Sequence, residues 1–168
     1  DKNKKYKLIA RIIEQEGGSL VAVHGRTKEQ RYAGNADWDA IAEVKAAVSL
    51  PVIGSGDVRT VADIQKMKQH THCDAVMIGR GAIANPWIFA GYDREQAPHE
   101  LVMETIHEHL AKSVQFYGEE DGQRLFRKYA VQYLLMKTLD RDARKEILKE
   151  RPSGEFLEML NQVYAMTA

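Results

Sequence analysis

The fold of this chain is decided by two short segments, PVIGSGDV at residues 51–58 and DAVMIGRGA at residues 74–82. Each begins with a short apolar run, which is typical of a strand in a parallel sheet, and each ends in glycines. The sequence between them is long enough for one helix, so the pattern predicts two parallel strands joined by a right-handed crossover. We therefore expect both glycine-rich turns at the same edge of one sheet.

The same alternation extends toward the N-terminus. Residues 3–16 carry an apolar stripe at helical spacing, and the run LVAV at residues 20–23 predicts a strand buried on both faces of a sheet. Residues 37–48 predict a second amphipathic helix. Thr60 stands three residues before Asp63, a pair that favours a capped helix start. The order of helices and strands predicts an α/β fold with about three parallel strands.

The alternation ends near Pro98. From there to Ala168 only helical patterns occur, with breaks at Gly118 and at the segment 152–154. We expect helices centred on residues 103–117 and 126–134 and two shorter ones near 141–150 and 154–166. The predicted organisation is thus an α/β domain at residues 1–97 followed by a helical bundle domain at residues 98–168.

Length and composition limit the alternatives. The chain has 168 residues, fewer than the roughly 250 of a complete eight-stranded α/β barrel. Lys plus Arg and Asp plus Glu both number 24, so the net charge does not indicate a nucleic acid or a membrane as partner. One cysteine excludes an internal disulfide, and no apolar run has the length of a signal sequence or a membrane span. We expect a soluble cytoplasmic protein and, because the chain starts at Asp1 without a methionine, a piece of a longer one.

The two turns have the composition of a phosphate-binding site. Glycines allow backbone N–H groups to approach an anion, the positive end of the following helix faces it, and an arginine adds a two-pronged charged contact. In the first turn, Asp57 could accept a hydrogen bond from a ribityl hydroxyl or from a loop N–H. The alternative for this segment is an ordinary turn with no ligand. The candidate phosphate and cofactor residues are Ser55, Gly56, Asp57, Gly79, Arg80 and Gly81.

Two further candidates follow the strand at residues 20–23. His24 stands at its carboxyl end, where α/β barrels place functional groups, and an imidazole there can donate to a phosphate, a flavin ring or a carbonyl. A structural histidine that caps the strand is the alternative. Arg26 points to the same side two residues later and could reach a polyanionic substrate.

The remaining cysteine and histidines do not indicate a catalytic or metal site. Cys73, His70 and His72 precede a strand, at the edge opposite to the one where barrel sites form, and they lack the second ligand pair of a zinc site. His107 and His109 are two residues apart on a helix and face different ways. We therefore exclude Cys73 as a nucleophile or a metal ligand. A solvated loop and helix surface is the expected location of all five side chains.

One charge pattern distinguishes the helical part. Residues 122–151 contain nine basic and four acidic side chains, a local excess of five positive charges. Arg124, Arg127 and Lys128 share one helix face, and such a stripe near Tyr129 and Tyr133 could follow an RNA backbone. A solvated helix face is the alternative interpretation.

Several segments together resemble the second half of the bacterial tRNA-dihydrouridine synthases. They occur in the same order and at similar spacings over nearly the whole chain, and the helical part matches more loosely. Members of that family are flavin barrels of the TIM type, and a C-terminal helical domain helps them hold tRNA. The segments are VHGRT at 23–27, GNADW at 34–38, PVI at 51–53, GD at 56–57, DAVMIGRGA at 74–82 and NPWIF at 85–89.

The resemblance implies roles for individual residues. Gly56, Asp57, Gly79 and Arg80 match FMN-contacting turns, and Arg80 would hold the phosphate. His24 matches the active-site histidine near the flavin, while Arg26 matches a residue on the RNA side. Position 55 departs from the family, which usually has Asn where this chain has Ser.

The resemblance also implies a reaction, the reduction of the C5–C6 bond of specific uridines in tRNA with FMN and NADPH. The family's flavin-contacting lysine and its proton-donating cysteine have no match, and Cys73 does not correspond to the latter. We therefore expect an inactive C-terminal fragment whose open sheet edges favour self-association. The alternatives are another FMN or phosphate-binding TIM-barrel oxidoreductase that acts on a small metabolite, and a non-enzymatic RNA-binding module.

Overall fold

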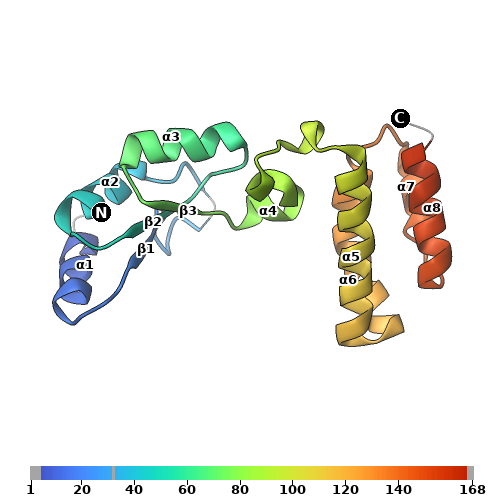
Figure 1. Ribbon diagram of the computed structural model, residues 1–168, viewed down its shortest axis with the longest axis horizontal. Coiled ribbons are helices and arrows are strands. Elements are labelled where there is room, and N and C mark those ends of the chain that lie inside the picture. Colours follow the sequence, from blue (N-terminus) through green and yellow to red (C-terminus); the bar gives the residue numbers. More distant parts are fainter. Residues whose placement is uncertain (1–4, 32, 166–168) are drawn as a thin grey trace. The chain divides into compact units, whose positions relative to one another are not determined.

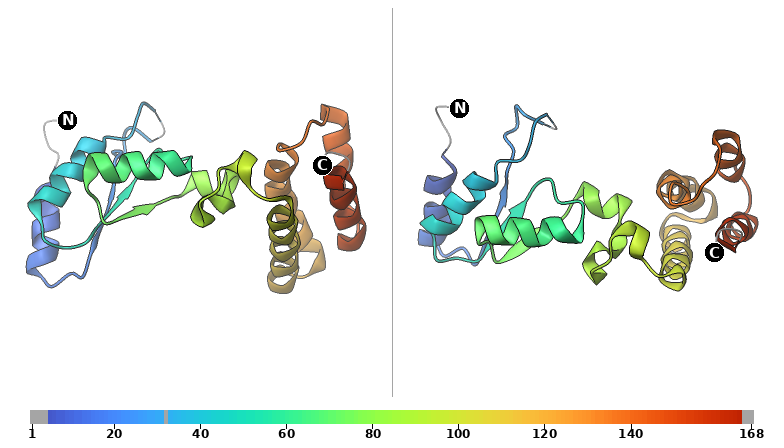
Figure 2. Two further views of the ribbon diagram at one scale, coloured as in Figure 1. Left: turned by 45° about the horizontal axis from the view of Figure 1, so that its top comes forward. Right: turned by 90° about the horizontal axis from the view of Figure 1, so that it is seen from above.

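A computed structural model of the chain describes residues 5–31 and 33–165. The chain folds into two compact units, Asp1–Gly91 and Tyr92–Ala168, which we call the strand unit and the helical unit. The predicted domain change near Pro98 lies a few residues beyond the division between the units. Figures 1 and 2 show the helices and strands of each unit.

The strand unit has the predicted α/β order. Its three strands form one parallel sheet in the order β1-β2-β3, consistent with part of a TIM barrel. In chain order the elements are α1 (Tyr6–Gln15), β1 (Val21–His24), α2 (Trp38–Ala47), β2 (Val52–Ser55), α3 (Val61–Thr71), β3 (Ala75–Met77), α4 (Arg80–Ala84) and a 3₁₀ turn (Pro86–Ala90).

Short polar side chains fix the starts of α2 and α3. The Asp37 carboxylate accepts a hydrogen bond from the Ala40 N–H at 3.0 Å, which satisfies one of the free donors of the first turn. Thr60 and Asp63 form the reciprocal capping box that their spacing predicts, because each side chain accepts from the other residue's backbone N–H. These caps place both helix starts at the edge where the strands end.

The core of the strand unit lies between the helices and one face of the sheet. Val21 and Val52 from the strands pack there with Ile41 and Val44 from α2 and Met67 from α3. The core also includes Ala10 from α1 and Cys73, which precedes β3, so the prediction of a solvated surface is wrong for Cys73. The apolar area removed from water at this face is the main source of stability for the unit.

The opposite face of the sheet is open, which corrects the prediction that the strand at residues 20–23 is buried on both faces. In β1, Val21 is buried whereas Ala22 and His24 are exposed, and in β3 Ala75 and Met77 are exposed. The prediction was wrong because most of the exposed side chains of the sheet are themselves apolar. Ala22 in β1 and Ala75 and Met77 in β3 suit a sheet face that a complete barrel would enclose. Part of the chemistry-bearing edge is therefore accessible from this open face.

The helix predicted at the N-terminus is present, but its apolar stripe is exposed. Ala10 and part of Ile13 face the core, while Leu8, Ile9 and Ile12 lie outward with 47–56% of their surface exposed. An exposed patch of large apolar side chains on one helix usually marks a contact surface.

The helical unit contains the helices that the sequence predicts beyond residue 98. Among its described residues no strand occurs, and α5 packs along α6 (Figure 2). Phe126 and Phe156 meet edge to face at 6.0 Å between ring centroids, and the buried Tyr164 donates its Oη–H to the Tyr133 carbonyl at 2.9 Å. The elements are a 3₁₀ turn (Arg94–Gln96), α5 (His99–Tyr117), α6 (Glu119–Leu134), α7 (Arg141–Ile147) and α8 (Ser153–Ala165).

None of the helices in the described ranges combines the length and the apolar character that crossing a membrane requires.

Candidate functional site

The candidate site is the edge of the sheet where the three strands end. The parallel register sets His24 beside Ser55 and Ser55 beside Met77, so these three residues form one row across the sheet. His24 Nδ1 lies 3.2 Å from the Ser55 carbonyl oxygen. Since a carbonyl oxygen only accepts, this contact requires a proton on Nδ1, and in the Nδ1–H tautomer Nε2 is an acceptor.

Sequence reasoning brought His24 and Ser55 to this edge but missed Met77. The side chain of Met77 is exposed on the open face, two residues along β3 from Ala75, which is also exposed. The period of two along the strand was the available signal, because Ala75 and Met77 share one face and Val76 lies on the other. A polarisable thioether beside an imidazole suits contact with an aromatic ring.

The turn after β2, residues 55–58, is closed by an ion pair. Arg26 Nη2 donates to both carboxylate oxygens of Asp57 at 2.6 Å, and Nη1 donates to the Ala33 carbonyl at 2.7 Å. The Arg26 side chain is only 5% exposed and that of Asp57 23%. Asp57 also accepts from the Ala36 N–H at 2.6 Å, so the loop after β1 is tied to the turn after β2. We call residues 55–58 the closed turn.

The electrostatics of this pair favour the ionised carboxylate. The hydrogen bond from Arg26 lowers the pKa of Asp57 below its ordinary value, and the Ala36 N–H adds to this effect while partial burial opposes it. Of the two uses predicted for Asp57, the structure shows the bond to a loop N–H. Arg26, predicted to face a polyanion, instead has its guanidinium turned into the protein.

Glycine at position 56 is required by the protein itself. Its φ is +134°, and a Cβ there would lie 2.7 Å from the Cβ of Ala36. The Gly56 carbonyl accepts from the Trp38 indole N–H at 3.0 Å, and Ser55 is buried. The closed turn is therefore packed against its own loop and helix start.

The turn after β3 is open by comparison. Gly79 and Arg80 are both exposed, and a Cβ placed on Gly79 would meet no heavy atom within 4 Å. An exposed backbone can be approached by a ligand, and an exposed guanidinium can reach an anion there. We call residues 79–80 the open turn.

Gly81 connects the two turns. A Cβ at this position would lie 2.4 Å from the Val58 carbonyl oxygen and 3.4 Å from the Cα of Arg59, so only glycine permits this approach. The predicted adjacency of the two glycine-rich turns is thus a direct backbone contact. Helix α4, which starts beside it, has five residues, and its dipole is correspondingly weaker than that of a long helix.

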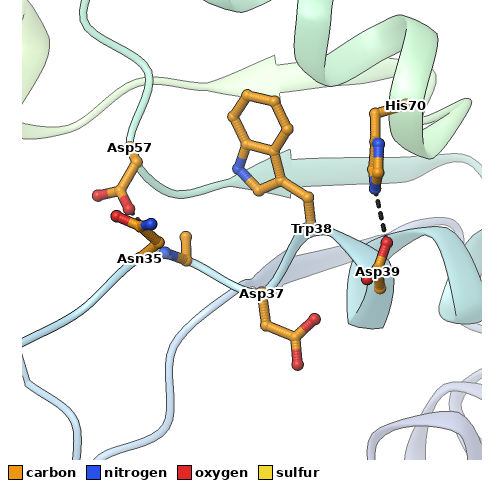
Figure 3. Close-up of a pocket in the computed structure, with 7 residues that line it drawn as sticks. Asn35, Asp37, Trp38, Asp39, Asp57 and His70 are labelled. Atoms are coloured by element: carbon orange, nitrogen blue, oxygen red, sulfur yellow. Dashed lines mark hydrogen bonds and ion pairs between the residues drawn. The ribbon is translucent and has the colours of Figure 1, made fainter.

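A pocket of about 390 Å³ lies beside the closed turn (Figure 3). His70 Nε2 lies 2.6 Å from Asp39 Oδ1, and the His70 ring is 6.1 Å from the Trp38 ring. His70, predicted at the start of a strand, lies near the end of α3 and contacts the start of α2. Three carboxylates, Asp37, Asp39 and Asp57, line this pocket, so its chemistry disfavours a phosphate.

The candidate RNA residues of α6 differ from one another. Arg124 is exposed and pairs with Asp121 at 2.6 Å, and Lys128 is exposed. Arg127 is only 15% exposed and lies 3.8 Å from Glu150. Tyr129 is exposed but Tyr133 is buried. Fewer side chains of α6 are therefore available to a polyanion than the sequence pattern predicts.

His109 corrects the prediction of a solvated histidine. Its ring packs 4.9 Å from Phe126 and 5.2 Å from Tyr129, and Nδ1 lies 3.1 Å from Tyr133 Oη. Burial lowers the pKa of His109 and raises that of Tyr133 to about 12. The sequence did not reveal this contact because the aromatic side chains come from α6. His107, by contrast, is exposed as predicted.

Comparison with known proteins places the sequence of this chain in a family. The sequence profile of the dihydrouridine synthases matches residues 1–165. tRNA-dihydrouridine synthase B of Pseudomonas aeruginosa is 39% identical over 140 residues, which are 79% of this chain and 42% of that protein. A probable tRNA-dihydrouridine synthase of Rickettsia bellii is 38% identical over 137 residues, which are 77% of this chain and 42% of that protein.

A third relative, a probable tRNA-dihydrouridine synthase of Mycobacterium leprae, is 41% identical over 133 residues, 74% of this chain and 35% of that protein. The chain thus spans about two fifths of the length of these curated relatives. The match covers both the strand unit and most of the helical unit, and it includes every candidate residue of the sheet edge. This chain belongs to the dihydrouridine synthase family.

Proposed function

We propose that this chain is the C-terminal part of a tRNA-dihydrouridine synthase, an oxidoreductase that reduces uridine in tRNA to 5,6-dihydrouridine with FMN and NADPH. The observation that carries the proposal is the family match over residues 1–165. The strand unit would be the C-terminal part of a TIM barrel and the helical unit a tRNA-binding domain. A role on tRNA agrees with a cytoplasmic location, which is part of the proposal.

The candidate residues of the sheet edge have two roles in FMN binding, contact with the cofactor and positioning of the turns. Arg80 and the Gly79 backbone are exposed and would hold its phosphate, while His24 and Met77 on the open face would contact its ring. Bound FMN supplies hydride chemistry, with NADPH as the reductant. The remaining candidates, Ser55, Gly56, Asp57 and Gly81, hold the two turns in position.

His24 has a defined hydrogen-bonding role in this proposal. Its Nδ1–H donates to the Ser55 carbonyl, which fixes the ring and leaves Nε2 as an acceptor on the exposed side. An acceptor there can orient an N–H of the flavin or of a uracil. We assign Arg26 to holding Asp57 in place of the RNA contact that the resemblance implies.

The proton donor of the reaction does not come from Cys73. That thiol is 3% exposed, and a Cβ on Gly54 of β2 would meet its Sγ at 3.1 Å, which places it behind the sheet, away from the open face. A proton donor must come within hydrogen-bond reach of the reacting carbon. We therefore propose that a cysteine from the remainder of the parent protein donates the proton and that this chain alone does not turn over.

We propose that the open face and the outward patch of α1 are covered by the remainder of the parent, or by a second copy when the chain is alone. Leu8, Ile9 and Ile12 form this patch of α1, and Leu20, which precedes β1, is exposed as well. A sheet with free edge strands pairs readily with another chain. Sedimentation across a concentration series should show association, and a monomer at every concentration would contradict the second possibility.

A chimaera tests the enzymatic proposal. The segment of the Pseudomonas aeruginosa relative that matches this chain is replaced by residues 1–165, and dihydrouridine is measured in tRNA from cells without their own synthases. We expect modified tRNA from the chimaera, much less from its Arg80→Gln variant, and no loss from the control Lys112→Gln, whose side chain is exposed on α5. A folded chimaera that fails to modify tRNA would contradict the proposal.

The tRNA contact is tested on the chain itself by binding in a salt series. Counterion release predicts a log–log slope of roughly −0.7 to −0.9 per phosphate neutralised. Changing the two exposed cations Arg124 and Lys128 to Glu should weaken binding and flatten the slope, whereas Lys112→Glu should change both less. Equal salt-dependence slopes for the two variants would show that this face of α6 is not part of the RNA-binding surface.

A further inference from the structure

The helical unit contains a cavity of its own, lined in part by residues that directly follow α6. Its volume is about 240 Å³. That is many times the roughly 10–15 Å³ that one water molecule requires, and it lies below the approximately 300–1,000 Å³ of pockets for drug-sized ligands. Its size therefore suits a small group. The side chains that define its chemistry are Arg94, Glu95, His99, Met136, Lys137 and Tyr164.

Two cations face this cavity without a carboxylate partner. Among the described residues, neither Arg94 nor Lys137 forms an ion pair, and both are partly buried. Six other cations of the helical unit do pair with Asp or Glu, namely Lys112, Arg124, Arg127, Lys145, Lys149 and Arg151. Lys128, Arg141 and Arg144 form no ion pair among the described residues either, so Arg94 and Lys137 are distinguished by lining one cavity together.

Contacts with neutral groups hold both cations in place. Arg94 Nη2 donates to the Gln132 carbonyl. Lys137 Nζ lies 4.3 Å from the centroid of the Tyr164 ring, a cation–π contact. Tyr164 is itself 2% exposed and is fixed by its hydrogen bond to Tyr133. Both charges are therefore positioned before any ligand arrives.

The charge of the cavity is incompletely compensated from within the protein. Of the described residues that line it, Glu95 alone carries a carboxylate, so two cations and one anion leave a net positive charge even with a neutral His99. Burial lowers the pKa of Lys137, and it raises that of Tyr164 to about 12, so the phenol stays neutral. An anion in the cavity would offset the cost of burying Lys137.

We propose that this cavity is a phosphate-binding pocket, with Arg94 and Lys137 as the residues that contact the phosphate oxygens. A net charge of one matches a phosphodiester, and a planar guanidinium beside an ammonium is a common pair for phosphate oxygens. The pocket does not depend on the proposed function. Its occupation by an RNA backbone phosphate does rest on that function, and free phosphate is the other source.

Inorganic phosphate tests the pocket directly. We would titrate the full chain with it and follow amide and side-chain NMR signals of His99, Lys137 and Tyr164. Lys137→Gln and Arg94→Gln should each weaken binding roughly tenfold, and the exposed control Lys112→Gln should leave it unchanged. No saturable shift in the wild type, or equal affinity in all variants, would overturn the proposal.

A gain of affinity separates a local effect from misfolding. Glu95→Gln removes the lining carboxylate, so phosphate should bind about two- to fivefold more tightly. A loss of stability would not produce this result. Unchanged or weaker binding in a folded Glu95→Gln chain would count against the charge argument.

A tRNA salt series then identifies the source of the phosphate. If an RNA phosphate occupies the pocket, Lys137→Gln should reduce the slope by roughly 0.7–0.9. An unchanged slope together with lost phosphate binding would assign the pocket to free phosphate. If neither the wild type nor any variant binds tRNA while the wild type still binds phosphate, the phosphate-binding pocket is supported and the proposed tRNA function is contradicted.

Discussion

The two glycine-rich turns at the strand ends have similar sequences and opposite structures. The closed turn after β2 buries Ser55 and uses Asp57 to hold Arg26 and the Ala36 N–H. The open turn after β3 leaves Gly79 and Arg80 exposed. A glycine-rich turn can thus serve either the protein's own packing or a ligand, and its surroundings decide which.

This difference divides the site into positioning residues and contact residues. Residues of the closed turn are buried or, like Asp57, paired with another loop, so changing them should affect stability first. Residues of the open turn are exposed to solvent, so changing them should affect binding and leave stability nearly intact. Gly81 lies where the two turns touch and should behave as a packing residue.

The largest expected loss of stability follows Gly81→Ala. Its Cβ would lie 2.4 Å from the Val58 carbonyl oxygen, a backbone atom that cannot move away easily. We expect a loss of about 3 kcal/mol in the free energy of unfolding, typical of overpacking. Denaturant unfolding measures it. The matched control Gly79→Ala, whose Cβ meets nothing within 4 Å, should cost under about 1 kcal/mol, and equal losses would contradict the contrast.

Asp57→Asn should have the next largest effect. It leaves the guanidinium of Arg26 buried without its counter-charge, and because Asp57 is partly exposed we expect a loss of about 2 kcal/mol, below that of a fully buried pair. The lowered pKa of Asp57 means that its contribution is present above the ordinary Asp value of 3.8 and is lost as the pH falls through the folded value. The variant should lack this acid-side loss.

A smaller effect on the free energy of unfolding is expected for His109, and it should appear in the pH dependence of stability. Because burial lowers its folded pKa below the ordinary 6.5, the unfolded chain binds more protons just below pH 6.5, and stability should fall there on acidification. His109→Gln should flatten the stability profile between about pH 5 and 6.5. The exposed neighbour His107 serves as control, and a flattening in His107→Gln of the same size would assign the effect elsewhere.

Arg80→Gln should change stability least. Arg80 is exposed, and substitutions at such sites usually stay within about 0.5 kcal/mol. A clear drop in the unfolding midpoint would show that the open turn is also part of the packing. The same variant is therefore suited to binding experiments, because its effect on a ligand can be measured in a folded chain.

The sequence predicted what depends on local patterns. The alternation of helices and parallel strands along the chain, the Thr60–Asp63 capping box and the adjacency of the turns follow from periodicity and spacing, and the structure has them. The closing of one turn did not follow, because the Arg26–Asp57 pair joins residues 31 positions apart. A side-chain contact at that separation leaves no periodic signal.

Burial was predicted less well than secondary structure. The apolar stripe of α1 and the open face of the sheet have the composition of core, yet Leu8 and Met77 are exposed. Apolar side chains indicate that a surface is to be covered, and the sequence does not say by what. The prediction for His109 was wrong in the opposite sense, because its side chain was expected in solvent and is packed against aromatic residues. Those residues lie on another helix, so the sequence around His109 did not indicate the contact.

The most direct test of the contrast between the turns is a comparison of FMN with riboflavin, which lacks the phosphate. Flavin fluorescence would be titrated with the wild-type chain and with Arg80→Gln. We predict that the wild type binds FMN at least about tenfold more tightly than riboflavin and that Arg80→Gln loses this preference with an unchanged unfolding midpoint. Equal affinity for both flavins, or a preference that survives Arg80→Gln, would contradict the assignment of the open turn to the phosphate.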